Sequence, residues 1–362
     1  MKLTPVLLAM SWLLVSTAAQ SDDDIIVLGG VSSTAPVVVE RKSPIYPVAA
    51  RQEGVEGWVY LQMTVGVDGS PHGIQVTQSS IDEVFDKAAI DAMKAWVFEP
   101  ATEQGEPVEA QFEVRHSFLL EGHQGTVSDR FYRQARGISA ALDDGKLKKA
   151  LKNIELLERD RIRLLAEEAY LDYFKAVYFE KTGDPEEALK QLNMALRDAK
   201  HGVSTSVYGQ MLRSAVRLNA TMGNLGSALE RYAALQALPG DFAADDATTS
   251  LVAQIESLVE GNQVLEFEAV LKACENCVGG DYYDWEHRPV RNRFSVPEVP
   301  ETVAETRLQC GNAFHYFQLE PGKTYVIPEL SDDCYLRVKG TQAASFSFLA
   351  LPDNDQPAVD TP

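Results

Sequence analysis

Residues 57–100 have the sequence GWVYLQMTVGVDGSPHGIQVTQSSIDEVFDKAAIDAMKAWVFEP, in which two hydrophobic periods follow one another. Apolar side chains first occupy every second position, which is the period of a strand with one buried face. These residues are Val59, Leu61, Met63, Val65 and Val67. Asp68-Gly69 then supplies a turn that tolerates positive φ, and Ile74 and Val76 begin a second strand. Residues 57–80 are therefore predicted to form a β-hairpin.

A helix and a third strand follow the hairpin. Ser79-Ser80 and Asp82 favour a helix start, and the predicted helix ends near Pro100. Its apolar stripe has spacings of three and four and consists of Phe85, Ala88, Ala89, Ala92, Met93 and Trp96. Apolar residues return to alternate positions from Val108 to Phe118. The unit is predicted to be β-β-α-β, with one helix on a three-stranded antiparallel sheet and residues 107–118 as a free edge.

Short motifs are spaced through and around this unit. They are Ser43-Pro44-Ile45-Tyr46-Pro47, Glu53-Gly54-Val55-Glu56-Gly57, Val67-Asp68-Gly69, Ser79-Ser80, Phe85-Asp86, Ala88-Ala89 and Trp96-Val97-Phe98-Glu99-Pro100. Together they resemble the TonB C-terminal domain. The resemblance covers about residues 40–120, under a quarter of the chain, and we place the domain at residues 44–120.

The resemblance implies a way of binding. In TonB, a short receptor segment is understood to pair with the edge strand near a tyrosine-proline motif. In such β-augmentation, main-chain hydrogen bonds supply affinity and alternate side chains supply selectivity. Carried over to this sequence, Tyr46 and Pro47 would flank the peptide. Four residues of the third strand would border it: Glu109, Gln111, Glu113 and Arg115. The alternative is that Tyr46-Pro47 only packs the start of the domain.

The first 43 residues are predicted to be a leader and a linker. Lys2, an apolar run from Val6 to Val15 and the small residues after it are typical of a signal peptide over residues 1–20. The run is shorter than the ~20 residues that a spanning helix needs, although an uncleaved inner-membrane anchor is the alternative. Residues 21–43 are expected to be a linker, in which Asp22-Asp23-Asp24 is a solvated charge run. Cleavage would leave the protein in the periplasm of a Gram-negative cell.

Residues 128–260 have a helical pattern with an internal repeat. Glycine precedes an Ala-Leu pair by five residues three times, in segments that begin at Gly145, Gly183 and Gly223. Glycine suits the turn between paired helices, and the small alanine lets those helices approach closely. We therefore expect stacked helical hairpins. The region resembles tetratricopeptide repeats, although its period exceeds their usual ~34 residues.

Beyond Gly261 the composition shifts to Tyr, Phe, Val, Pro and Cys, which predicts a small β domain over residues 264–352 and a polar tail over 353–362. The expected strands are 264–271, 314–319, 324–327, 335–338 and 345–351. All four cysteines of the chain lie in this part: Cys274, Cys277, Cys310 and Cys334. In an oxidising compartment they suggest two disulfides, and of the three possible connectivities we favour the one in which Cys310 is bonded to Cys334. The alternative for the close pair is a redox or metal site, which lacks completing ligands in the sequence.

The composition favours protein partners. The chain has 53 acidic and 33 basic residues, and its formal net charge of -20 repels phosphate backbones, so nucleic acid is not expected as a partner. The six histidines lie far apart without ligand spacing, and His116 is expected to be buried or at the edge rather than a general base. The run from Asp281 to Trp285 suggests a sugar or peptide platform, with core aromatics as the simpler interpretation. No metal, no cofactor and no enzymatic activity are therefore expected.

These predictions favour a periplasmic adapter or accessory factor of a TonB-dependent transport system. The first domain would bind an extended peptide by edge-strand addition, and the helical region would dock a second protein. The partners would be an outer-membrane receptor or TonB-system components, and the same edge allows a homodimer. Two alternatives remain, an anchored TonB-type energy transducer that couples an inner-membrane motor to outer-membrane receptors, and an envelope thiol oxidoreductase using Cys274 and Cys277. The sequence lacks a long proline-rich spacer, which weakens the first alternative.

Overall fold

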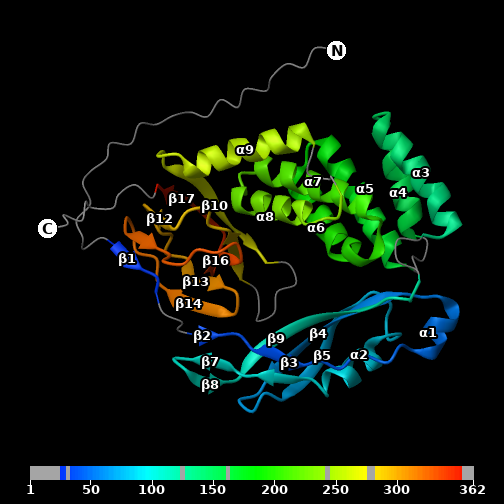
Figure 1. Cartoon of the computed structure of the whole chain (residues 1–362), viewed down its shortest axis with the longest axis horizontal. Coiled ribbons are helices and arrows are strands. Elements are labelled where there is room, and N and C mark those ends of the chain that lie inside the picture. Colours follow the sequence, from blue (N-terminus) through cyan, green and yellow to red (C-terminus); the bar gives the residue numbers. More distant parts are fainter. Residues whose placement is uncertain are drawn as a thin grey trace.

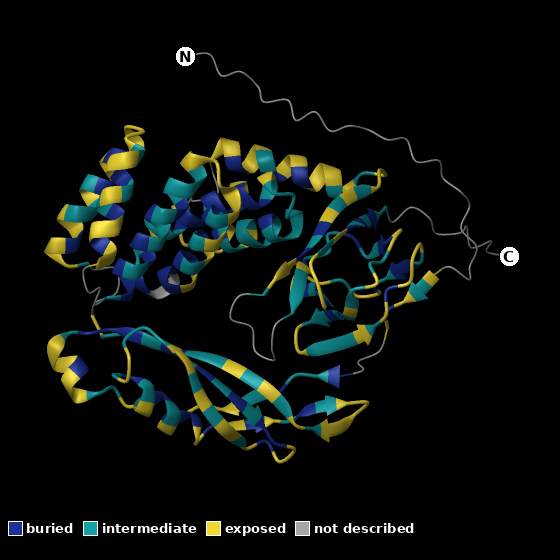
Figure 2. Ribbon diagram, turned by 180° about the vertical axis from the view of Figure 1, so that it is seen from behind, coloured by how far each residue is buried: buried dark blue, intermediate teal, exposed yellow. Residues whose placement is uncertain are grey.

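The computed structural model describes residues 25–29, 33–122, 127–159, 164–240, 245–274 and 282–352. They form three units that lie at the corners of a triangle (Figure 1). These are an amino-terminal α+β module, a helical array and a β domain. Each unit has its own hydrophobic core, and Figure 2 shows the buried residues gathered inside each one.

The amino-terminal module is built on a three-stranded antiparallel sheet. Its main elements are α1 (Val48–Glu53), β4 (Gly57–Val65), β5 (Pro71–Ser79), α2 (Asp86–Met93) and β9 (Ala110–Phe118). The order across the sheet is β5-β4-β9, and Leu61 of β4 lies opposite Val114 of β9. The core includes four alternate side chains of β4 and residues in and beside α2: Val59, Leu61, Met63, Val65, Phe85, Ala89 and Met93. The structure thus has the β-β-α-β order that the sequence predicts.

The segment predicted as a linker over residues 21–43 contains strands, so that prediction is wrong for its described part. These strands are β1 (Ile25–Val27), β2 (Ser33–Thr34) and β3 (Val37–Glu40). β1 pairs in parallel with β15 (Thr324–Val326) of the β domain. β2 lies between β14 (Ala313–Phe317) of the β domain and β7 (Ala101–Glu103) of the amino-terminal module. These short segments satisfy their backbone groups through distant partners, which no local pattern indicates.

The predicted helix is too long, and the predicted third strand begins too early. Three short strands separate them: β6 (Val97–Glu99), β7 and β8 (Glu106–Val108). β6 pairs with β3, and Phe98 N donates to Gly69 O at 3.0 Å instead of continuing the helix beyond Met93. β8 pairs with β7, so the edge strand begins at Ala110 rather than at residue 107. Long-range pairing here overrides the apolar period that extends to Trp96.

The helical array is a series of antiparallel hairpins. Its helices are α3 (Asp129–Asp143), α4 (Leu147–Arg159), α5 (Leu165–Thr182), α6 (Pro185–Gly202), α7 (Thr205–Thr221), α8 (Leu225–Gln236) and α9 (Asp246–Glu260). Gly145, Gly183 and Gly223 occupy turns between helices, with φ of 68°, 83° and 77°. The alanine five residues after each glycine is completely buried. The predicted glycine turns and close alanine contacts are confirmed, and the array is consistent with a tetratricopeptide-like region.

The β domain consists of two packed sheets. Its remaining strands are β10 (Leu265–Ala273), β11 (Tyr283–His287), β12 (Arg293–Ser295), β13 (Val303–Cys310), β16 (Cys334–Gly340) and β17 (Ala344–Leu351). One sheet has the order β1-β15-β12-β17-β10 and the other β11-β16-β13-β14, with β10 and β11 joining them. Stacked rings of Phe294, Tyr325 and Phe348 form much of the core. The sequence did not predict β11, β12 and β13. Their sequences are polar or short, and their burial depends on the opposing sheet.

The helical array and the β domain are fixed to each other. Arg291 donates hydrogen bonds of 2.8, 2.9 and 2.7 Å to the carbonyl groups of Leu258, Val259 and Gly261 at the end of α9. These groups lack partners within the helix, so the guanidinium satisfies them and opposes the helix dipole. Gly226 of α8 lies against Arg288, where an added Cβ would be 2.5 Å from the carbonyl oxygen. The two units therefore meet through a close backbone approach.

Several predictions concern residues outside the described ranges. They are the signal peptide, Asp22-Asp23-Asp24, Cys277, Asp281 and the tail over residues 353–362. Within the described ranges, no helix combines the length and apolar character that crossing a membrane requires. The same part of the chain has no group of three or more His, Cys, Asp or Glu side chains that could hold a metal ion.

Candidate partner-binding site

β9 is an edge strand of the amino-terminal module. Among the described residues it pairs only with β4, from Gly57 opposite Phe118 to Val65 opposite Ala110. Its other side carries backbone N–H and C=O groups that have no ladder partner in this part of the chain. Such an edge can accept a further strand through main-chain hydrogen bonds.

The side chains predicted to border a peptide lie on or beside this edge. Glu109, Gln111 and Glu113 are exposed. Gln111 Nε2 donates to Thr64 Oγ1 at 2.9 Å, which holds that side chain on the outer face of the sheet. Glu109 Oε1 lies 3.8 Å from Nε2 of His72. The edge therefore presents an acidic row, and oppositely charged cross-strand pairs are the favourable ones.

Arg115 lies in the same row but contacts the helical array. Its guanidinium donates to the carboxylate of Asp198 in α6, and it stacks 5.1 Å from the ring of Trp58. The side chains of Arg115 and Asp198 are only 12% and 4% exposed. The structure therefore separates Arg115 from the other three residues, because its side chain joins two units of the chain.

Tyr46 and Pro47 lie near the carboxyl end of β9. The Tyr46 hydroxyl donates to Val55 O at 2.6 Å, and its ring meets Phe118 at 5.8 Å between centroids. Burial raises the pKa of Tyr46 to about 12, the charge of Glu56 adds to this, and Arg51 opposes it. Pro47 is the N-cap of α1. This geometry favours the interpretation that Tyr46-Pro47 packs the start of the domain.

The contact between the module and the array contains further polar groups that the sequence did not single out. Trp58 Nε1 donates to Glu168 Oε2 of α5 at 3.1 Å. The carboxylate of Glu56 accepts from Leu120 N at 2.9 Å and from Leu165 N at 3.0 Å. Glu56 thus satisfies the first helical N–H of α5, which has no intrahelical partner. These residues, with Arg115 and Asp198, form what we call the module-array joint.

Two carboxyl groups of α5 have raised pKa values, Glu168 at the joint and Asp172 one turn further along the helix. Burial raises the pKa of Glu168 to about 7, the Trp58 N–H and Arg115 oppose this, and Asp198 and Asp172 add to it. Burial also raises the pKa of Asp172 to about 6, with Lys175 opposing it. The sequence contains one signal of this joint. Trp58 and Tyr60 lie on the face of β4 that alternation assigns to solvent, and two neighbouring large aromatic side chains on such a face suggest that another unit covers them.

The other residues that the sequence analysis considered for a functional role pack in cores or form disulfides, as far as the structure describes them. His116 is buried, its ring lies 5.2 Å from Trp96, and burial, followed by the charge of Arg41, lowers its pKa. Trp285 packs on Phe348 in the β domain, as expected for core aromatics. Cys310 and Cys334 form a disulfide between neighbouring strands, and Cys274 is disulfide-bonded as well.

Residues 42–120 match the family model of the Gram-negative bacterial TonB protein C-terminal. This segment belongs to the TonB C-terminal domain family. Protein TonB of Vibrio cholerae serotype O1 is 32% identical over 100 residues, which are 26% of this chain and 41% of that protein. Protein tonB2 of Pseudomonas aeruginosa is 45% identical over 63 residues, which are 17% of this chain and 23% of that protein. The chain therefore spans less than half the length of these curated relatives.

A solved structure is also similar to this TonB C-terminal domain. The solution NMR structure of the Pseudomonas aeruginosa TonB CTD is 29% identical in sequence. The match covers 27% of this chain and 96% of that chain, with a TM-score of 0.22.

The motifs of the TonB C-terminal domain have local structural reasons. Gly69 has a φ of 78°, and an added Cβ would lie 2.0 Å from Phe98 O. A Cβ on Gly57 would lie 2.6 Å from the ring of Phe85, and Ser80 Oγ accepts from Trp58 N at 2.8 Å. Glycine is therefore required where the hairpin turn meets β6 and where β4 passes the start of α2.

Proposed function

We propose that the protein is a periplasmic adapter or accessory factor of a TonB-dependent transport system and binds an extended segment of a protein partner along β9. The relatives support a role in a TonB system. The observation that carries the finer proposal is the unpaired side of β9 in a domain of this family, bordered by the exposed Glu109, Gln111 and Glu113. The partner is an outer-membrane receptor or a TonB-system component.

The chemistry of the edge defines the preferred segment. A partner strand gains main-chain hydrogen bonds along β9, whatever its sequence. Glu109 and Glu113 share the outer face of the strand, because side chains four residues apart point the same way. Opposite charges across a sheet contribute about 0.2–1 kcal/mol per pair, so basic residues at matching positions are favoured.

The three-unit arrangement supports an adapter. The joint through Arg115 and Asp198 and the β2 bridge hold the domain against the other two units. The described chain is thus a compact platform in which the exposed part of the edge, from Glu109 to Glu113, is a surface separate from the helical array. The predicted signal peptide supports export, and with it a periplasmic location.

Two adjacent substitutions test the proposal, Glu113→Pro and Val114→Pro. Neighbouring N–H groups in a strand point to opposite sides, so one proline removes a donor from the free edge and the other breaks pairing with β4. Circular dichroism identifies the variant that keeps the fold. The probes are synthetic peptides from the periplasmic segments of outer-membrane receptors, and affinity is measured by calorimetry.

The folded proline variant should bind the peptides at least about tenfold more weakly than the unmodified chain. A matched pair on the opposite edge, Gln75→Pro and Val76→Pro in β5, is the control, and its folded member should bind normally. Unchanged affinity in the folded β9 variant would show that the edge does not hold the partner.

A further inference from the structure

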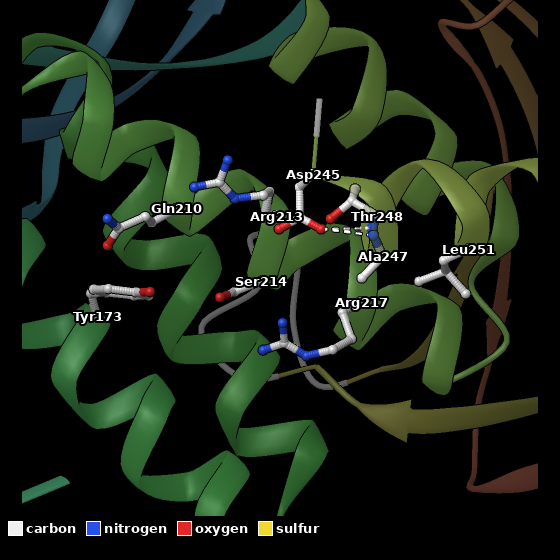
Figure 3. Close-up of a pocket in the computed structure, with 9 residues that line it drawn as sticks. All are labelled: Tyr173, Gln210, Arg213, Ser214, Arg217, Asp245, Ala247, Thr248 and Leu251. Atoms are coloured by element: carbon white, nitrogen blue, oxygen red, sulfur yellow. Dashed lines mark hydrogen bonds between the residues drawn. The ribbon is translucent and has the colours of Figure 1, made fainter. Parts of the chain in front are cut away.

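A small cavity in the helical array lies between α5, α7 and the start of α9 (Figure 3). Its volume is about 270 Å³. Pockets for whole small ligands are usually ~300–1,000 Å³, so this cavity suits one or two residues of a larger partner. It belongs to the array alone and includes no residue of β9.

Uncharged polar groups line one side of the cavity without partners. The side chains of Tyr173, Gln210 and Ser214 have no hydrogen bond within the described residues. Ser214 is only 9% exposed, and Figure 3 shows the Tyr173 hydroxyl facing it across the cavity. None of their polar atoms is both buried and unpaired, so water reaches them, and polar groups of a ligand can replace that water.

Two arginines provide positive charge on the same helix. Arg213 and Arg217 are four residues apart on α7, and Figure 3 shows both guanidinium groups on the side where Ser214 lies. Residues at this spacing share a helix face and lie about 6 Å apart along the axis. The cavity thus combines a pair of planar cationic forks with hydroxyl and amide groups, which is the chemistry that recognises carboxylates.

The chain already places its own carboxylates beside these arginines. Glu180 accepts from Arg217 at 2.9 and 3.0 Å, and the Arg217 side chain is 51% exposed. Asp245 accepts from Thr248 N and Ala247 N, which lower its pKa, and the charge of Arg213 adds to this. The Arg217–Glu180 pair is exposed and contributes little to stability, so a partner's carboxylate can exchange with Glu180 or share the Arg217 guanidinium.

We propose that this cavity is a second binding site and takes an extended acidic segment of a partner protein with carboxylates at alternate positions. Alternate side chains of an extended chain are about 6.6 Å apart on one face, which is close to the rise of about 6 Å between residues 213 and 217 along α7. The hydroxyl groups of Tyr173 and Ser214 and the Gln210 amide would bond the backbone between the acids. The proposal extends the adapter function but rests on a surface separate from β9.

Binding of short peptides to the full chain tests the proposal. The probe is a fluorescent peptide with blocked ends and the sequence Gly-Ser-Asp-Ser-Asp-Ser-Gly. One control peptide replaces both Asp with Ser, a second makes the two acids adjacent, and a third has no internal acid but a free carboxyl end. Anisotropy should give an affinity for the first peptide at least about tenfold higher than for any control.

Variants then assign the binding to the cavity. Arg213→Gln and Arg217→Gln should each weaken binding by about tenfold or more, because each removes charge-assisted hydrogen bonds. Glu180→Gln should strengthen it, since it removes the competing carboxylate. Arg136→Gln, at an exposed arginine of α3, is the matched control and should change nothing.

Three results would overturn the proposal: equal binding of adjacent and alternate acids, binding only through a free carboxyl end, or equal losses in the Arg136 and Arg217 variants. The folded β9 proline variant should still bind the acidic peptide normally. Failure of the proposed edge pairing and failure of this second site are therefore distinguishable.

Discussion

Glu168 makes the stability of the module-array joint depend on pH. Its pKa is about 7 in the folded chain against an ordinary value of 4.5. Each unit of difference in pKa corresponds to about 1.4 kcal/mol, so keeping this carboxyl ionised in the folded chain costs about 3 kcal/mol. Because the folded pKa is raised, the folded state retains its proton while the unfolded state loses it. The contribution of Glu168 to stability is therefore lost as pH rises from about 4.5 to about 7, and it does not change further above that.

Glu168→Gln removes the ionisation but keeps an oxygen that can accept from Trp58 Nε1. The free energy of unfolding should be measured with urea at pH 5.5 and pH 8, since the pI is near 4.7 and more acidic buffers invite precipitation. Between these two values the unmodified chain should lose about 2 kcal/mol more than the variant. Fluorescence and circular dichroism should be followed together, because a chain of three units need not unfold in one step.

The comparison between the two chains cancels the titration of groups that do not interact with Glu168. Parallel pH dependence, with a difference under about 0.5 kcal/mol, would refute the claim that burial at the joint raises this pKa. Trp58→Phe provides a second check, because it keeps the titrating carboxyl group and changes its surroundings instead. It removes the N–H that favours the carboxylate, so the loss of stability should extend to higher pH.

Three further substitutions test other contacts. Gly69→Ala should destabilise the domain by about 3 kcal/mol in chemical unfolding, because it adds strain at positive φ and a clash with Phe98 O. Gly73→Ala is the control: it has positive φ without a clash and should cost about 1 kcal/mol. Arg115→Met should lower the free energy of unfolding by about 3 kcal/mol, since it leaves the buried Asp198 without this cation. Arg217→Met, which removes an exposed pair, is the control and should leave the unfolding midpoint nearly unchanged. Equal effects of the two substitutions would contradict the claim that the Arg115–Asp198 pair stabilises the joint. Gly226→Val should cost about 1–3 kcal/mol and speed proteolysis between the array and the β domain, and Gly137→Ala, which makes only ordinary contact, is its control.

Local periodicity predicted the elements whose burial is visible along the chain. The alternation in β4 and the spacing in α2 identified a hairpin and a helix because every second or every third to fourth side chain enters one core. The glycine turns of the array were predictable for a similar reason, since positive φ and close helix contact restrict the residue at those positions. The motif resemblance identified the TonB C-terminal domain, which the comparisons support.

The candidate site was predictable only in part. Glu109, Gln111 and Glu113 are exposed beside the free edge, where alternation placed them. Arg115 obeys the same alternation, yet its side chain is buried by an element that lies 83 residues away in the sequence. Nothing in the pattern of a single strand distinguishes a face that meets solvent from one that meets another unit.

The sequence by itself determined which residues form the hairpin, the helix hairpins and the TonB C-terminal domain, because these depend on local period, turn chemistry and motif spacing. Only the tertiary structure decided that the segment before the domain supplies strands to two units, that Arg115 and Glu168 meet at a joint, and that Arg213 and Arg217 share a cavity with α9. The physical reason is that burial and charge pairing between distant segments depend on how whole units pack, and no residue carries that information in its neighbours along the chain.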